Sequence, residues 1–171
     1  DPGKPVPTVG GNVSMKPASS GPYDQRSIER RDDVLVYSTP VLEEDVEVTG
    51  PVMIELYAST DARDTDFTGK LVDVWPSGYA QILLEGVLRG RYRDSFSKPQ
   101  LLTPGQTEKY LIDLWSTSNL FRKGHRIRIE ISSSNFPKYD RNPNTGHAIG
   151  EDAELKVARQ TVYHDAGRPS H

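Results

Sequence analysis

The chain has 171 residues, a formal net charge of −3 at pH 7 and no cysteine. A length of roughly 100–200 residues is typical of a single domain. The absence of cysteine excludes disulfides, thiolate catalysis and thiolate metal sites. The small negative charge provides no overall field that would attract nucleic acid or an anionic membrane.

No apolar run approaches the roughly 20 residues that span a bilayer. The sequence therefore predicts neither a membrane partner nor a nucleic-acid partner, and we expect a cytoplasmic location. The chain opens on Asp1-Pro2-Gly3, without an initiator Met or a signal-like segment. We therefore expect it to be a piece of a longer protein.

Residues 1–33 show little periodicity and much Pro, Gly, Ser and charge, with Val9, Met15, Tyr23 and Ile28 as apolar anchors. This composition predicts an ordered arm that lies over another part of the protein. The second region, 34–171, is expected to form the domain itself.

About eight short strands are predicted in that region, with turn signals between them and no long amphipathic helix. In chain order they are 34–37, 46–48, 52–58, 67–75, 80–93, 110–115, 126–131 and 155–163. Turns are expected at 49–51, 76–78 and 104–105, and one helical turn at 116–121. Gly86 or Gly90 is expected to mark a bulge or bend. The pattern indicates an all-β fold, an antiparallel β-sandwich.

The clearest strand alternates strictly between apolar and charged residues. Its apolar residues are Ile127, Ile129 and Ile131, and its charged residues are Arg126, Arg128 and Glu130. Such alternation predicts one buried face, with Ile129 at its centre, and one face in water.

Two charged clusters invite a functional interpretation. Asp61, Asp64 and Asp66 lie between two strands and are compatible with calcium, but the EF-hand spacing is absent. Turn carboxylates that bond their own backbone are the favoured alternative. Arg89, Arg91 and Arg93 share one predicted strand face. Nucleic-acid binding needs a broader basic footprint, so a solvated or interdomain face is favoured.

No complete active site is present. Ser132, Ser133 and Ser134 follow the alternating strand, but no Gly-x-Ser-x-Gly elbow surrounds them, and no His and acid accompany them in an ordered set. His147 and His164 lack metal-binding spacing. We therefore predict no catalytic residue, no metal and no cofactor in this chain.

The loop over 135–146 carries two X-Pro steps and several Asx-turn formers. Two interpretations remain open. Either it is simply a rigid loop, or a second domain packs on it with Phe136 and Tyr139 as anchors.

Several segments together carry a family resemblance. They are Gly21-Pro22-Tyr23-Asp24-Gln25-Arg26, Asp33-Val34-Leu35-Val36-Tyr37, Asp64-Thr65-Asp66-Phe67-Thr68, Lys70-Leu71-Val72-Asp73-Val74, Gly124-His125-Arg126-Ile127, Ser132-Ser133-Ser134-Asn135-Phe136-Pro137 and Asp140-Arg141-Asn142-Pro143-Asn144-Thr145-Gly146. Nearly the whole chain resembles, in order, the C-terminal jelly-roll domain of the cocaine esterase and X-Pro dipeptidyl-peptidase (CocE/NonD) family of serine hydrolases.

The resemblance implies a jelly-roll, galactose-binding-like sandwich that contains no catalytic residue. In this family the Ser, Asp and His of the triad lie in an upstream α/β-hydrolase domain. That domain would be the partner of this chain, in an enzyme that acts on a small ester or amide. The family's domain also has strands beyond both ends of the matching region, so we expect this chain to lack its first and last strands. The resemblance leaves the substrate open.

The segment Asn12-Val13-Ser14-Met15 corresponds by position to a loop that, in the family, puts apolar side chains into the acyl pocket. Ser14 and Met15 would accordingly form part of the pocket wall. Here Ser14 stands in place of an apolar residue and Met15 in place of an aromatic one, which suggests a different or more polar pocket. The alternative is a surface loop in which Met15 only fastens the arm to the sandwich.

Two other functions remain open. A jelly roll of this kind can bind carbohydrate or another ligand through exposed aromatic side chains, here Trp75, Tyr79 and Trp115. The domain can also serve a purely structural role, with contacts in a homo-oligomer.

Overall fold

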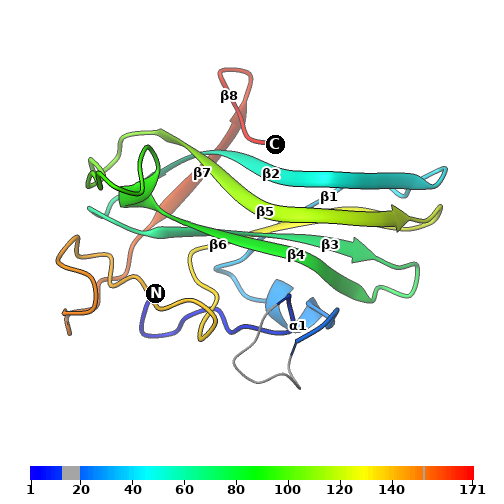
Figure 1. Cartoon of the computed structure of the whole chain (residues 1–171), viewed down its shortest axis with the longest axis horizontal. Helices are drawn as coiled ribbons and strands as arrows, with labels where there is room; N and C mark the ends of the chain where they lie inside the picture. The colour runs from blue at the N-terminus through cyan, green and yellow to red at the C-terminus, as the bar shows by residue number, and fades with distance from the viewer. Residues whose placement is uncertain (13–19, 152) are drawn as a thin grey trace.

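The structure is a computed structural model that describes residues 1–12, 20–151 and 153–171. In these residues eight strands form two antiparallel sheets, with strand orders β1-β6-β3-β4 and β5-β2-β7-β8 (Figure 1). The strands are β1 (Leu35–Ser38), β2 (Val46–Thr60), β3 (Asp66–Val74), β4 (Ala80–Arg89), β5 (Glu108–Phe121), β6 (Arg126–Ser132), β7 (Gln160–Asp165) and β8 (Arg168–Pro169). The helices are α1 (Arg26–Glu29) and the 3-10 helix η2 (Gly90–Tyr92). The predicted antiparallel β-sandwich is confirmed.

The core lies between the two sheets and is built from alternate residues of each strand. Ile54, Leu56 and Ala58 of β2 point inward, and their neighbours on β5 point inward with them. Full burial of one such large apolar side chain contributes roughly 1.5–3 kcal/mol. The core residues of β5 are Tyr110, Ile112, Leu114 and Phe121.

Pairing between β2 and β5 overrides two local predictions. The turn expected at 49–51 is wrong, because β2 continues through it with a register irregularity between Pro51 and Met53. The helical turn expected at 116–121 is also wrong, because these residues complete β5 and bury Phe121 against the core. A long antiparallel partner supplies backbone hydrogen bonds that outweigh weak local turn preferences.

Other strand boundaries differ from the sequence-based expectation. The strand predicted at 80–93 ends at Arg89, and Gly90 begins η2, so the bend is at Gly90. The strand predicted over 155–163 begins only at Gln160.

The outer face of β6 is covered, which corrects the prediction that its charged face lies in water. Glu130 is 2% exposed, and Arg128 donates to Glu29 of α1 at 2.7 Å. Lys70 of the neighbouring β3 donates to Gln25 at 2.9 Å. Figure 1 shows the described part of residues 1–33 running along this sheet, on the side away from β2 and β5.

A small apolar cluster secures this arm. Val6 and Ile28 are buried together with Val34, and Val9 packs against them. Tyr23, by contrast, is 43% exposed and is not a buried anchor. The expected anchor Met15 lies outside the described residues. In the part of the chain that the structure describes, no helix is long and apolar enough to cross a membrane.

Candidate functional site

The proposed pocket-wall residues Ser14 and Met15 lie outside the described residues, which stop at residue 12 and resume at residue 20. The two described ends lie side by side. The backbone N–H groups of Gly11 and Gly21 each donate to the other residue's carbonyl oxygen at 2.9 Å. This pair of hydrogen bonds fixes where the intervening segment leaves and rejoins the arm.

The predicted interdomain residues lie on a loop that runs beside the arm. Phe136 donates to the carbonyl of Val6 at 2.9 Å and accepts from the N–H of Thr8 at 2.7 Å. Its side chain remains 39% exposed, with the Arg141 guanidinium 5.4 Å from the ring centroid. Tyr139 is half-buried, and this burial, reinforced by the nearby Glu85 carboxylate, raises the pKa of its hydroxyl.

Glu85 of β4 connects the arm to this loop. The Nδ2 atom of Asn135 and the Nζ atom of Lys138 each lie 2.5 Å from one of its carboxylate oxygens. Lys138 Nζ also lies 2.5 Å from the side-chain oxygen of Asn12. The structure thus brings the ends of the segment that carries Ser14 and Met15 together with the loop that carries Phe136 and Tyr139.

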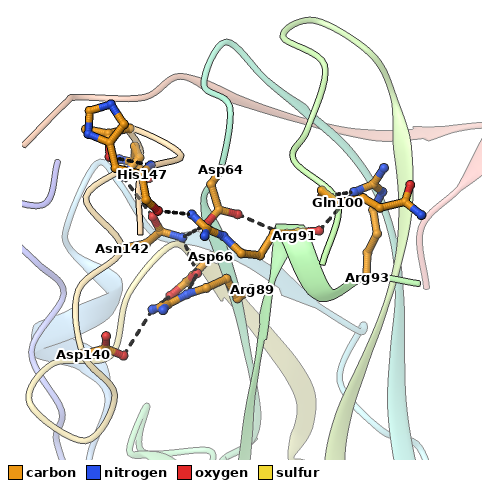
Figure 2. A network of polar contacts seen from close by, with 12 residues as sticks. Asp64, Asp66, Arg89, Arg91, Arg93, Gln100, Asp140, Asn142 and His147 are labelled. Atoms are coloured by element: carbon orange, nitrogen blue, oxygen red, sulfur yellow. Dashed lines mark hydrogen bonds and ion pairs between the residues drawn. The ribbon is translucent and has the colours of Figure 1, made fainter. Parts of the chain in front are cut away.

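Asp64 and Asp66 of the acidic cluster form one network with the basic residues (Figure 2). Arg91 binds Asp64 through its side chain at 2.7 Å and its backbone N–H at 2.9 Å. Arg89 binds Asp66 through Nε at 2.9 Å, and Asn142 Nδ2 bridges the two carboxylates at 3.0 and 2.7 Å.

The basic residues therefore do not share a solvated strand face. Only Arg89 belongs to β4, Arg91 lies in η2, and Arg93 follows it and pairs with Glu108 at 3.3 Å. All three are partly buried. Arg89 and Arg91 pin the loop around Asn142 to the ends of β3 and β4, through Asp140 and the carbonyl of His147.

Asp64 and Asp66 are engaged by these donors, while Asp61 accepts from the backbone N–H of Arg159 at 2.8 Å. Burial raises the pKa of Asp66, and the Arg89 guanidinium opposes this effect. No group of three or more His, Asp or Glu side chains among the described residues is arranged to hold a metal ion. The geometry favours the structural interpretation of the acidic cluster.

Ser132, at the end of β6, and Ser134 are engaged in structural contacts. Ser132 Oγ lies 2.6 Å from Thr68 Oγ1, and Ser134 Oγ accepts from the N–H of Val6 at 2.8 Å. His125 pairs with Asp73 at 2.8 Å. It lies at the opposite end of β6 from Ser132, roughly 20 Å away along an extended strand. This arrangement keeps His125 out of reach of Ser132.

The three candidate aromatic residues do not form a single platform. Trp75 and Tyr79 flank the β3–β4 turn, with ring centroids 5.9 Å apart, and His125 lies 5.3 Å from the Trp75 ring. Trp115 is on β5, in the other sheet, and is 65% exposed.

Sequence reasoning did not identify Glu85, Lys138 or Asn135 as a cluster. The available signal was the Gly10-Gly11 pair. Gly11 adopts φ 100°, and a Cβ atom there would lie 1.8 Å from a Glu85 carboxylate oxygen. Paired glycines indicate a close backbone approach, but the sequence does not reveal what is approached.

Comparison with known proteins identifies the family of this domain. Residues 3–171 match the family described as the X-Pro dipeptidyl-peptidase C-terminal non-catalytic domain. The chain belongs to this family. It is also 49% identical, over 173 aligned residues and all of its length, to a cocaine esterase from Rhodococcus sp. (strain MB1 Bresler), and it covers 30% of that protein.

Two solved structures support the same assignment. An aminopeptidase from a marine sediment archaeon (Thaumarchaeota archaeon) matches 99% of this chain with a TM-score of 0.88 and 36% identity. An alpha-amino acid ester hydrolase matches 99% with a TM-score of 0.91 and 35% identity. The chain spans 31% and 30% of these two proteins. It is therefore a C-terminal non-catalytic domain of the CocE/NonD type, and its relatives are about three times as long.

Proposed function

We propose that this domain packs on an upstream α/β-hydrolase catalytic domain of the same protein and helps to shape its acyl pocket. The observation that carries the proposal is the meeting of two segments at Glu85: the arm ends on either side of Ser14 and Met15, and the loop that holds Phe136 and Tyr139. The 49% identity to a cocaine esterase supports an acyl-ester substrate, and the 36% identity to an aminopeptidase supports an amide.

In this proposal the nucleophilic Ser, the His and the Asp belong to the upstream domain. A small ester or amide would acylate that Ser, and water would release the acid. This domain contributes positioning of the acyl group and exclusion of water. The isolated chain should accordingly be inert: a phosphonate probe for active-site serines should label the parent protein stoichiometrically and leave this chain unlabelled.

Met15 provides the direct test of the pocket-wall assignment. A Met side chain is unbranched and adapts to irregular ligand shapes. In the parent enzyme, Met15→Ala should change the ratio of kcat/KM between long and short acyl esters by up to about tenfold, equivalent to ~1.4 kcal/mol. If Met15 only fastens the arm, the substitution should lower the melting temperature and leave that ratio unchanged.

A carbohydrate-binding function is the second candidate, because Trp75 is 44% exposed and its ring lies beside the rings of His125 and Tyr79. Exposed aromatic rings of this kind stack on sugar rings. Isothermal titration of the chain with an oligosaccharide panel tests this candidate. Heat that disappears in Trp75→Ala would favour it, and no heat in any titration would eliminate it.

A further inference from the structure

The carboxylate of Glu85 lies where three segments converge. Glu85 is 1% exposed on β4, Lys138 and Asn135 approach it from the loop, and the arm backbone passes directly over it. Gly11 has no room for a side chain at this point, because a Cβ atom there would lie 1.8 Å from Glu85 Oε1. The carboxylate therefore leaves room only for a glycine where the arm passes over it.

Lys138 fixes the loop and the arm at the same time. Its ammonium group binds Glu85 Oε1 and the Asn12 side-chain oxygen, both at 2.5 Å, while its backbone N–H donates to Thr8 Oγ1 at 3.2 Å. Asn12 is the last described residue before the segment that holds Ser14 and Met15. This side chain thus links the Gly10–Asn12 end of the arm to the loop and to β4, in addition to the backbone bonds of Phe136 with Val6 and Thr8.

The stability of a fold does not by itself require a buried ion pair. The side chains of Lys138 and Glu85 are only 11% and 1% exposed. The desolvation of a buried pair offsets most of its attraction, and apolar replacements of similar volume are often neutral. What an apolar pair would lose is the defined geometry that links the two segments.

We propose that Glu85 and Lys138 are positioning residues that determine the acyl selectivity of the parent hydrolase. They do so by holding the Gly10–Asn12 end of the arm in register with the loop that carries Phe136 and Tyr139. This inference rests on the proposed function, since it requires that these two segments border the acyl pocket.

The test uses the full-length parent enzyme with Glu85→Gln, Lys138→Met and the double variant. Each single variant leaves one buried charge unpaired, so its melting temperature should fall. The double variant removes both charges and should recover much of that loss. If the pair positions the segments, all three variants should shift the long-to-short ratio of kcat/KM by about threefold or more. The shift should persist in the double variant.

Arg93→Met is the matched control. Arg93 is another partly buried cation, paired with Glu108 and bonded to the carbonyls of Gly90 and Gln100. These contacts involve neither the arm nor the 134–140 loop. Its loss should lower the melting temperature and leave the acyl ratio as in the wild type.

The outcomes separate this inference from the proposed function. If Met15→Ala shifts the ratio but the Glu85 and Lys138 variants do not, the pocket wall stands and the positioning role is wrong. The positioning role is also wrong if the double variant recovers both the wild-type melting temperature and the wild-type ratio of kcat/KM. If the pair shifts the ratio but Met15→Ala does not, the pair remains selectivity-determining and Met15 is removed from the wall. If neither Met15→Ala nor the Glu85 and Lys138 variants shift the long-to-short ratio of kcat/KM, both proposals fail.

Discussion

The Glu130 carboxyl group is buried on the outer face of β6, beneath the arm. Its strongest partner is the Lys70 ammonium group, 3.5 Å away, which is itself bound to Gln25. Burial raises the pKa of Glu130 from an ordinary value of 4.5 to about 7; Lys70 opposes this shift and the Glu29 carboxylate reinforces it. The folded protein therefore holds a proton here that the unfolded chain releases at lower pH.

This raised pKa predicts a stability that falls with increasing pH. Because the pKa of Glu130 is higher in the folded state, the contribution is fully present below about pH 4.5 and is lost as the pH rises through about 7. The change should be on the order of 3 kcal/mol across that window. Urea unfolding between about pH 4 and 8 measures it. Glu130→Gln should flatten the dependence, and parallel curves for the two proteins would exclude Glu130 as its source.

At the residue scale, the sequence indicated which side chains share a face of β6 but not what covers each face. Ile131 is 4% exposed and belongs to the core, as predicted. Ile129 is only partly buried against that core, so the centre of the buried face is closer to Ile131. The burial of Glu130 was not predictable from alternation, since its covering residues lie about a hundred positions earlier in the chain.

Among the strands, β3 and β4 contribute a pair of glycines to the sandwich interior. Gly69 and Gly86 are register partners; Gly69 faces β2 and β5, and Gly86 faces β5. A Cβ atom on Gly69 would lie 2.4 Å from Ile54, and one on Gly86 would lie 2.1 Å from the carbonyl oxygen of Asp113. The two sheets approach closely at this point because neither glycine has a side chain.

Gly86→Ala should therefore destabilise the fold by roughly 1–3 kcal/mol, because the neighbouring backbone of β5 must move. Thermal unfolding of the chain measures the effect. Gly167→Ala is the matched control, since the nearest atom to its Cβ would be at an ordinary 3.4 Å. Equal melting temperatures for the two alanine variants would show that the sheets can separate there without loss.

At the element scale, prediction was successful where a strand had a clear apolar alternation and failed where pairing with a distant strand decided the outcome. Tyr110, Ile112 and Leu114 were correctly placed on one face of β5. The helical turn predicted at 116–121 is wrong, because these residues complete β5. Their pairing with β2, from Ser116↔Pro51 to Phe121↔Val46, is a long-range property.

For the whole molecule, the sandwich and the family could be predicted because motifs spread along the chain agree with one another. The contacts at Glu85 could not, since they depend on three segments meeting in space.

The loop beside the arm leaves Phe136 39% exposed, with Arg141 over its ring. A bulky aromatic residue held in place and left partly in solvent is suited to contact with a second domain.

Phe136→Ala tests whether the ring contacts a second domain or only the arm and its own loop. If the catalytic domain covers the exposed part of the ring, the substitution removes apolar contact that is absent from the isolated chain. Burial of a large apolar side chain is worth roughly 1.5–3 kcal/mol. The melting temperature should therefore fall further in the full-length parent than in the isolated chain, as measured by calorimetry of both. Phe96→Ala, at an 83% exposed residue, should have little effect in either protein. Equal losses for Phe136→Ala in the two proteins would place the ring outside the interdomain contact, because only the local packing would then have been disturbed.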